Sequence, residues 1–295
     1  MKPLRARIAE ETRRTKVPQP VIEKDYALSY ILAGLSTHPV LRECLIFKGG
    51  TALKKLFFGD YRFSEDLDYS AIKAPKGKAL MTAMESAGQE AKHLLLEQGP
   101  FEVVLRRYEE RDPHPHGQEA FTFHVQFPWH PSPLCRIKVE VFHDEPVILP
   151  PDERLLIHGY DENLAVRVRG YQLMEIVAEK LRTLLQTHSK LTTRGWNRPR
   201  ARDYYDLWRL FSTYGKTLSP ERLLPLLRKK CQHRKVGFRA VNDFFTDELI
   251  SEARTHWQGT LGAFVADLPP LDEVLGDLRN ELAKLTTMER EPKKK

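Results

Sequence analysis

The sequence Lys48-Gly-Gly-Thr51, followed after a loop by Asp66-Leu-Asp68, decides the fold of the first half of the chain. The apolar run Cys44–Phe47 predicts a short strand that the two glycines end, and Asp66–Ser70 predicts a second strand. Residues two apart on a strand share a face. Asp66 and Asp68 are therefore expected to project together, while Leu67 enters the core.

These two carboxylates are candidate metal ligands. Carboxylates directed at one point repel each other unless a cation lies between them, and Mg²⁺ prefers such oxygen ligands together with substrate phosphates. Gly49 and Gly50 let the backbone approach a triphosphate, and a helix capped by Thr51 offers its first N–H groups to the phosphates. Neither the glycine turn nor the acidic pair is a specific signal alone. Together they predict a nucleotide site with Mg²⁺ at Asp66 and Asp68. No Gly-Lys-Ser/Thr follows the glycines, so the site is not a Walker loop.

A third acid would complete a two-metal site. In Arg136-Ile-Lys-Val-Glu-Val-Phe142, strand alternation puts Lys138 and Glu140 on one face and the apolar residues on the other. Glu140 is the candidate for a third metal ligand or for the base that takes the proton. The alternative is an exposed strand residue paired to Lys138, and the sequence leaves both open.

Lys180 lies in the middle of the apolar stripe of a helix expected over Tyr171–His188. Its ammonium group is expected either to reach solvent or to contact a triphosphate, and Lys180→Met is expected to spare the fold. In the next expected helix, Asp203 flanks the apolar stripe and Asp206 lies farther round. Asp203 is therefore the better candidate for an inward role, with ion pairs to neighbouring arginines as the alternative for both.

Positive charge is concentrated in one segment. The chain has a net charge of +7, yet residues 190–239 hold fourteen Lys and Arg against three acids, a local balance of +11. Such a block is typical of a protein that binds a polyanion, although a solvated basic face would have the same composition. Arg194, Arg198 and Arg200 lie in a loop ahead of the Asp203 helix and are the candidate RNA-binding residues.

Two lobes are expected, residues 1–150 with mixed structure and residues 151–295 with helices, because Pro146, Pro150 and Pro151 mark a boundary. The insert Asp112–Gly117 is expected to be a turn or a flexible loop. No segment is long and apolar enough for a membrane span or a signal peptide, which predicts a cytoplasmic protein. The expected helices are Arg5–Arg14, Val21–Gly34, Lys78–Gln98, Tyr171–His188, Ala201–Thr213, Pro220–Cys231, Asp243–Trp257 and Leu271–Met288, and the further strands are Phe101–Glu109, Phe121–Phe127 and Leu134–Phe142.

Five motifs, in order along the chain, resemble those of the AbiEii/AbiGii toxin family, which includes the MenT toxins. They are Phe47-Lys-Gly-Gly-Thr-Ala-Leu53, Tyr61-Arg-Phe-Ser-Glu-Asp-Leu-Asp68, Ile137-Lys-Val-Glu-Val141, Glu179-Lys-Leu181 and Arg202-Asp-Tyr-Tyr-Asp-Leu207. The resemblance implies an α+β fold, in which a DNA polymerase β-like nucleotidyltransferase lobe with a mixed sheet is followed by a helical lobe. Ser64 matches a family serine that lies beside the acidic pair, close enough to touch a phosphate.

The resemblance also implies a function. Mg²⁺ would be held at Asp66 and Asp68, an NTP would be the substrate, and Lys180 with Asp203 or Asp206 would be essential. Several relatives of the MenT type add nucleotides to the 3′ acceptor end of tRNA, which stops translation, and a cognate antitoxin opposes them.

Three functions follow as hypotheses. The first is transfer of an NMP from an NTP to the 3′ end of an RNA, tRNA above all, by the toxin of a toxin–antitoxin pair. The second is nucleotidyl or phosphoryl transfer to a protein hydroxyl, and the third is an RNA-binding module without activity. The pair Asp66 and Asp68 argues against the third hypothesis, and the basic segment 190–239 favours RNA over protein as the acceptor.

Overall fold

The computed structural model describes residues 2–108 and 117–287 of the chain. These form two compact units, Met1–Tyr171 (unit 1) and Gln172–Lys295 (unit 2). The units meet at Tyr171 and Gln172, whereas the sequence suggested a boundary at residue 150; the short strands β6 and β7, which lie between these two points, join the sheet of unit 1. Of the insert expected at Asp112–Gly117, all but Gly117 lies outside the described residues.

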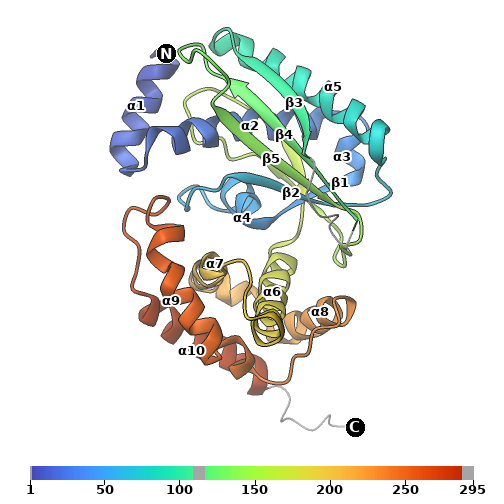
Figure 1. Cartoon of the computed structure of the whole chain (residues 1–295), viewed down its shortest axis with the longest axis vertical. Helices are drawn as coiled ribbons and strands as arrows, with labels where there is room; N and C mark the ends of the chain where they lie inside the picture. The colour runs from blue at the N-terminus through green and yellow to red at the C-terminus, as the bar shows by residue number, and fades with distance from the viewer. Residues whose placement is uncertain (1, 109–116, 288–295) are drawn as a thin grey trace. The chain divides into compact units, whose positions relative to one another are not determined.

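Unit 1 combines a sheet with helices (Figure 1). Its strands are β1 (Leu45–Lys48), β2 (Asp66–Ala71), β3 (Glu102–Tyr108), β4 (Gln118–Gln126), β5 (Cys135–Phe142), β6 (Asp152–Leu155) and β7 (Arg167–Gly170). Its helices are α1 (Leu4–Thr15), α2 (Gln19–Thr37), α3 (Leu41–Cys44), α4 (Gly49–Ala52) and α5 (Gly77–Leu95), with a π-helical turn over Leu53–Phe57 and a 3-10 turn over Leu96–Gln98. Pro20 at the start of α2 removes no helical hydrogen bond, since the first amides of a helix have no partner within it.

The sheet has the order β3-β4-β5-β2-β1-β7-β6. It is mixed, because β2 pairs in parallel with β5 and β1 in parallel with β7, whereas the other neighbours are antiparallel. Asp66 lies opposite Lys138, and Asp68 lies opposite both Glu140 and Lys48. Since residues opposite each other on paired strands share a face, these five polar side chains belong to one face of the sheet.

Helices α2 and α5 cover the other face (Figure 1). The two helices cross closely, because a Cβ at Gly34 of α2 would lie 2.3 Å from the Ala87 carbonyl oxygen of α5. Gly88 of α5 packs against Phe123 of β4 in the same way. The apolar side chains of β2, β4 and β5 that this face buries are Leu67, Tyr69, Phe121, Phe123, Val125, Ile137, Val139 and Val141. Burial of this apolar face leaves the polar residues of β2 and β5 on the opposite side.

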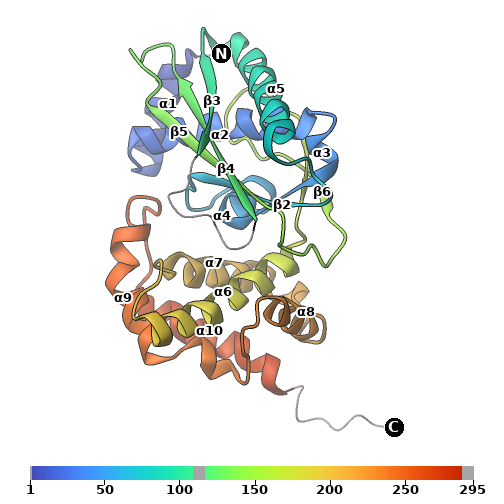
Figure 2. The same cartoon turned by 45° about the vertical axis from the view of Figure 1, so that its right-hand side comes forward.

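Unit 2 is helical (Figure 2). Its helices are α6 (Leu173–Arg194), α7 (Ala201–Tyr214), α8 (Pro220–His233), α9 (Asp247–Leu261) and α10 (Leu271–Thr287), with 3-10 turns over Gly215–Thr217 and Val241–Phe244. Helix α6 packs against α7, α8 and α9. The single helix expected over Asp243–Trp257 is divided, because the Asp243 carboxylate accepts the backbone N–H groups of Arg239 and Ala240 and closes a separate turn.

The predicted α+β class, with a mixed sheet followed by helices, is confirmed. Strands β6 and β7 were not predicted. They are four residues long and mostly polar, so they lack the alternating pattern by which a longer strand is recognised. Within the described ranges, no helix has both the length and the apolar character needed to cross a membrane.

Candidate active site

Gly49 makes the turn between β1 and the helical residues that follow. Its φ of +82° lies in the left-handed region, and α4 begins at Gly49 itself. Thr51 therefore lies inside the helix, and the prediction that it caps the helix is wrong. Its hydroxyl instead donates a hydrogen bond to the backbone oxygen of Asp66, which ties the first turn of α4 to the start of β2.

The carboxylate of Asp68 lies against this turn. A Cβ at Gly49 would lie only 2.6 Å from Asp68 Oδ2, so glycine is the residue that fits. Asp66 and Asp68 are both partly exposed and share the face of β2 that α2 and α5 do not cover. The glycine turn and the acidic pair thus form one group.

Gly50 makes room for two further polar side chains. A Cβ at Gly50 would lie 2.5 Å from Arg62 Nη2 and 3.5 Å from Ser64 Oγ. The structure thus brings Ser64 to the glycine turn. Arg62, which the sequence analysis did not select, is buried there and donates through Nη1 to the carbonyl of Phe63 at 3.2 Å. Its place two residues before Ser64 in the second motif is the signal that could have identified it.

Lys48 is a second cation on this face that the sequence analysis did not select as a site residue. Its ammonium group is 4.5 Å from the centre of the Phe142 ring and 5.8 Å from that of Tyr171, so it is held over aromatic faces.

On the opposite face of the sheet, burial and then the charge of Asp68 raise the pKa of the Tyr69 hydroxyl above its usual range. Tyr69 therefore stays neutral on the face of β2 opposite the acidic pair.

Glu140 lies next to Asp68 in the sheet but is engaged by other side chains. Its Oε1 accepts hydrogen bonds from Gln118 and, at 2.7 Å, from Lys138. The sequence analysis offered an exposed residue paired to Lys138 as one alternative. The pair with Lys138 is present, but Glu140 is buried. In the part of the chain that the structure describes, no three His, Cys, Asp or Glu side chains are placed to hold a metal ion. Glu140 lies opposite Asp68 on the neighbouring strand, so its role as a third ligand or as the base stays a prediction.

The acidic pair alone has the donor set that Mg²⁺ uses. One or two carboxylates suffice when water and phosphate oxygens complete the octahedron. Asp68 Oδ2 lies where a Cβ at Gly49 would intrude, and Asp66 shares its face, so the residues present fit the ion.

We expect Gly49→Ala to lower the free energy of unfolding by about 1–3 kcal/mol, because alanine is strained at this φ and its Cβ would displace Asp68. Urea denaturation measures the change. Gly59→Ala is the matched control, since a Cβ there meets nothing within 4 Å and the φ is ordinary. Equal stability of the two variants would contradict the geometry of the turn.

In unit 2, α6 and α7 bring Lys180, Asp203 and Asp206 together. Lys180 Nζ donates to Asp203 Oδ1 at 2.8 Å and to Asp206 Oδ2 at 2.6 Å. Lys180 is buried and does not extend to solvent, and Asp206 is fully buried. Both aspartates therefore face inward, whereas only Asp203 was expected to do so. Residues three apart lie on adjacent turns of a helix, so one lysine can reach both carboxylates.

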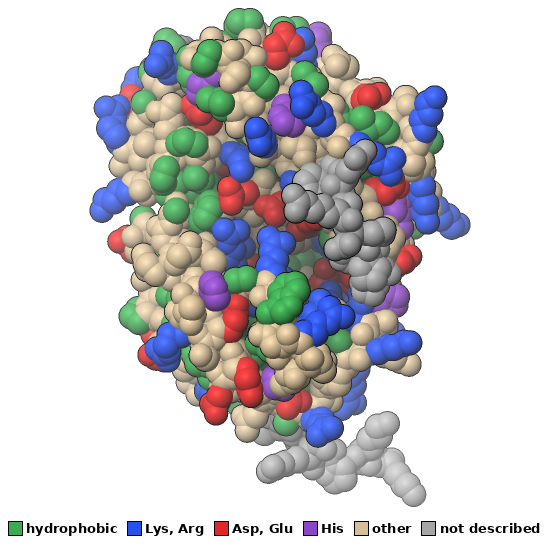
Figure 3. All heavy atoms as spheres, viewed as in Figure 1, with side chains coloured by type: hydrophobic (Ala, Val, Ile, Leu, Met, Phe, Trp, Pro, Cys, Tyr) green, Lys and Arg blue, Asp and Glu red, His purple; other side chains and the backbone are tan. Residues whose placement is uncertain are grey.

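The three arginines predicted to bind RNA lie at the end of α6 and in the loop after it. Arg194 is in the last turn of α6, and the Arg200 guanidinium is 3.7 Å from the Asp203 carboxylate. Burial, followed by the charges of Arg200 and Arg194, lowers the pKa of Lys190, so these cations are crowded. On the face that Figure 3 shows, Lys and Arg are interspersed with Asp and Glu, so charge on that face alone does not define a binding surface.

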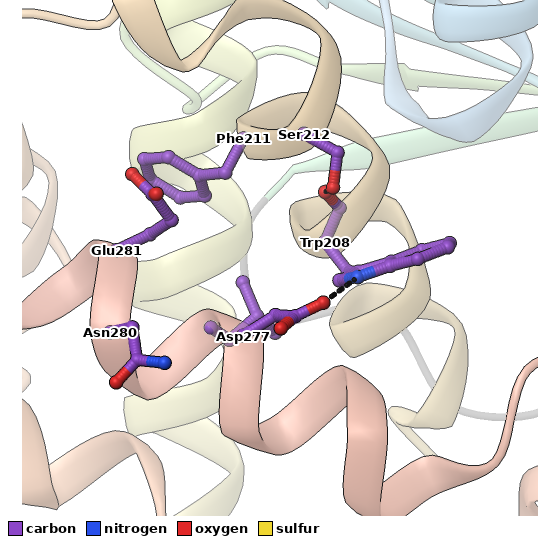
Figure 4. Close-up of a pocket in the computed structure, with 7 residues that line it drawn as sticks. Trp208, Phe211, Ser212, Asp277, Asn280 and Glu281 are labelled. Carbon is purple, nitrogen blue, oxygen red and sulfur yellow. Dashed lines mark hydrogen bonds between the residues drawn. The ribbon is translucent and has the colours of Figure 1, made fainter.

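A cavity of about 270 Å³ lies between α7 and α10 (Figure 4). It is lined by Trp208, Phe211, Ser212, Asp277, Leu278, Asn280 and Glu281. Trp208 Nε1 donates to Asp277 Oδ2 at 2.9 Å, as the close-up shows. None of the candidate site residues lines this cavity.

Comparisons with known proteins agree with the motifs. The family model described as "Nucleotidyl transferase AbiEii toxin, Type IV TA system" matches residues 30–277. The fold is similar to that of MenT4, a nucleotidyltransferase toxin from Mycobacterium tuberculosis H37Rv, with a TM-score of 0.63 and 22% identity over 96% of this chain and 89% of that chain. No curated protein sequence matches.

Proposed function

The chain belongs to the family of AbiEii nucleotidyltransferase toxins of type IV toxin–antitoxin systems, and on this premise we propose that it modifies RNA. The proposed reaction transfers an NMP from an NTP to the 3′ hydroxyl of an RNA, tRNA above all, and releases pyrophosphate. A modified acceptor end would block aminoacylation and translation in the cytoplasm until the cognate antitoxin opposes the toxin.

The observation that carries the proposal is the contact of Asp68 with the glycine turn. The first N–H groups of a helix have no acceptor within it, so those of Gly50 and Thr51 are suited to phosphate oxygens. Ser64 adds a hydroxyl and Arg62 a positive charge beside Gly50. Phosphate-binding groups and metal-binding carboxylates are thus adjacent, which is what transfer from a nucleoside triphosphate requires.

Asp66 and Asp68 are the residues proposed to hold Mg²⁺. When bound, the ion would neutralise phosphate charge and orient the α-phosphate for in-line attack. Glu140, opposite Asp68 on β5, is proposed as the third ligand or as the base that takes the proton, and it also holds the Lys138 ammonium group. Lys180, Asp203 and Asp206 are proposed to keep the helices of unit 2 in the active arrangement.

The location of the label tests the acceptor. Purified protein is incubated with Mg²⁺, total RNA and soluble protein extract, and each NTP is supplied in turn with a labelled α-phosphate. We expect label on RNA of tRNA size, and none after periodate oxidation of the RNA 3′ end. Label on protein alone, or label that survives periodate, would replace this proposal with transfer to a protein hydroxyl.

A triple substitution tests the role of the arginines. We expect Arg194→Gln, Arg198→Gln and Arg200→Gln together to weaken binding of all RNA sequences alike. Each lost phosphate contact lowers the slope of log affinity against log salt by about 0.7–0.9. NTP binding is expected to persist, since it depends on residues of unit 1. A salt slope equal to that of the wild type would remove these arginines from the RNA interface.

A further inference from the structure

The loop between α6 and α7 exposes one large aromatic ring. Trp196 is 71% exposed, and the other exposed large hydrophobic residues in the described ranges are aliphatic and less exposed. A tryptophan is usually buried for most of its surface, because its ring is the largest apolar side chain. An indole that remains in solvent on a polar loop leaves an aromatic face open to a partner.

Hydrogen bonds anchor the loop that carries Trp196. Gly195 ends α6 in a left-handed conformation and donates its N–H to the Leu191 carbonyl at 2.9 Å. Immediately after Trp196, the Asn197 amide donates to the Thr187 hydroxyl at 2.7 Å, and Thr187 is buried. The backbone N–H of Arg200 contacts the Glu252 carboxylate at 3.4 Å. The loop is thus anchored on both sides of the indole.

Cations flank Trp196 in the chain. Lys190 and Arg194 are four residues apart on α6 and so lie on one face of the helix, and Arg198 and Arg200 follow in the loop. Charges of Arg182 on α6 and of Arg234, which directly follows α8, also act on Lys190. Like charges repel one another, and a bound polyanion relieves their repulsion.

Cations together with a solvent-exposed aromatic ring favour one class of partner. Phosphates satisfy the cations in any nucleic acid, whereas the face of an indole stacks only on a base that is not already stacked in a duplex. We propose that Trp196 is a stacking platform for an unpaired base of the RNA, with Lys190, Arg194, Arg198 and Arg200 holding the flanking phosphates. This proposal rests on the RNA acceptor proposed above and specifies its recognised part as single-stranded.

Binding of two RNAs to the full chain tests the proposal, in the absence of NTP. The probes are an unstructured single strand and a long blunt duplex. For Trp196→Ala we expect at least about a fivefold loss of affinity for the single strand, the lower end of what stacking of one base contributes. Affinity for the duplex and the salt slope are expected to remain those of the wild type, because no phosphate contact is lost.

Three controls make the result specific. Trp196→Phe keeps an aromatic face and is expected to retain most of the affinity. Leu134→Ala removes another exposed apolar side chain, in unit 1, and is expected to bind as the wild type does. Thermal unfolding verifies that each variant is folded, which is expected because Trp196 is exposed.

Unchanged affinity of Trp196→Ala for the single strand, or an equal loss for single strand and duplex, would overturn the proposal. Failure of the proposed function is a separate outcome. If labelled NMP never reaches RNA while Trp196→Ala still loses single-strand binding selectively, the stacking platform stands and the transfer reaction does not.

Discussion

Asp68→Asn is expected to reduce NMP transfer at least about 100-fold while leaving the protein folded. The metal ion contributes several kcal/mol of charge stabilisation in the transition state, and a neutral amide is a poor ligand for it. The same loss is expected for Asp66→Asn, because both carboxylates lie on one face of β2. Initial rates at saturating NTP, with purified variants and excess RNA, measure the effect.

Loss of activity must be separated from loss of structure. The two carboxylates repel each other when no cation is bound, so each substitution relieves this repulsion. The melting temperature without Mg²⁺ is therefore expected to equal or exceed that of the wild type. Stabilisation by added Mg²⁺ should also be smaller in the variants, which is a readout independent of catalysis. Full activity in either variant would contradict the assignment of the acidic pair.

Lys180→Met is expected to lower the free energy of unfolding of unit 2 by about 3–5 kcal/mol. Removal of the ammonium group leaves Asp203 and Asp206 together in a buried place without their shared cation. The sequence predicted instead that Lys180→Met spares the fold, but the ammonium group is buried between two aspartates rather than in solvent. Urea denaturation followed by circular dichroism measures the change.

A second substitution shows whether the shared ion pair is the cause. Asp206→Asn removes one of the two negative charges that Lys180 contacts, so Lys180→Met with Asp206→Asn is expected to be more stable than the sum of the single effects predicts. Additive effects would mean that the lysine stabilises the unit by other contacts. Unchanged stability of Lys180→Met would remove the structural role altogether.

The sequence predicted the elements that have strong local signals. Asp66 and Asp68 were placed on one strand face because alternation depends only on spacing, and the break at Gly49 followed from the residue type. The mixed sheet was predicted from the family resemblance. The strand pairing that sets Asp68 opposite both Lys48 and Glu140 joins distant segments, which no local pattern reveals.

Other features could not be predicted because a side chain had several partners to choose from. Thr51 was expected to cap a helix, but its hydroxyl bonds to the backbone of Asp66. Lys180 lies in an apolar stripe, and only the packing of α6 on α7 shows that two aspartates meet it there. For Glu140 the sequence left a metal-binding role and a pair with Lys138 both open, and the structure shows that pair together with a hydrogen bond from Gln118 of β4. Each outcome depends on tertiary contacts rather than on spacing.

Labels at two positions of the NTP test most directly whether the protein transfers an NMP to RNA. Wild type and Asp68→Asn are incubated with Mg²⁺, RNA and NTP labelled either at the α- or at the γ-phosphate. For the wild type we expect the α-label on RNA and the γ-label in released pyrophosphate. For Asp68→Asn we expect neither labelled RNA nor labelled pyrophosphate. Appearance of the γ-label on any acceptor, or transfer of the α-label to RNA by Asp68→Asn at the wild-type rate, would contradict these expectations.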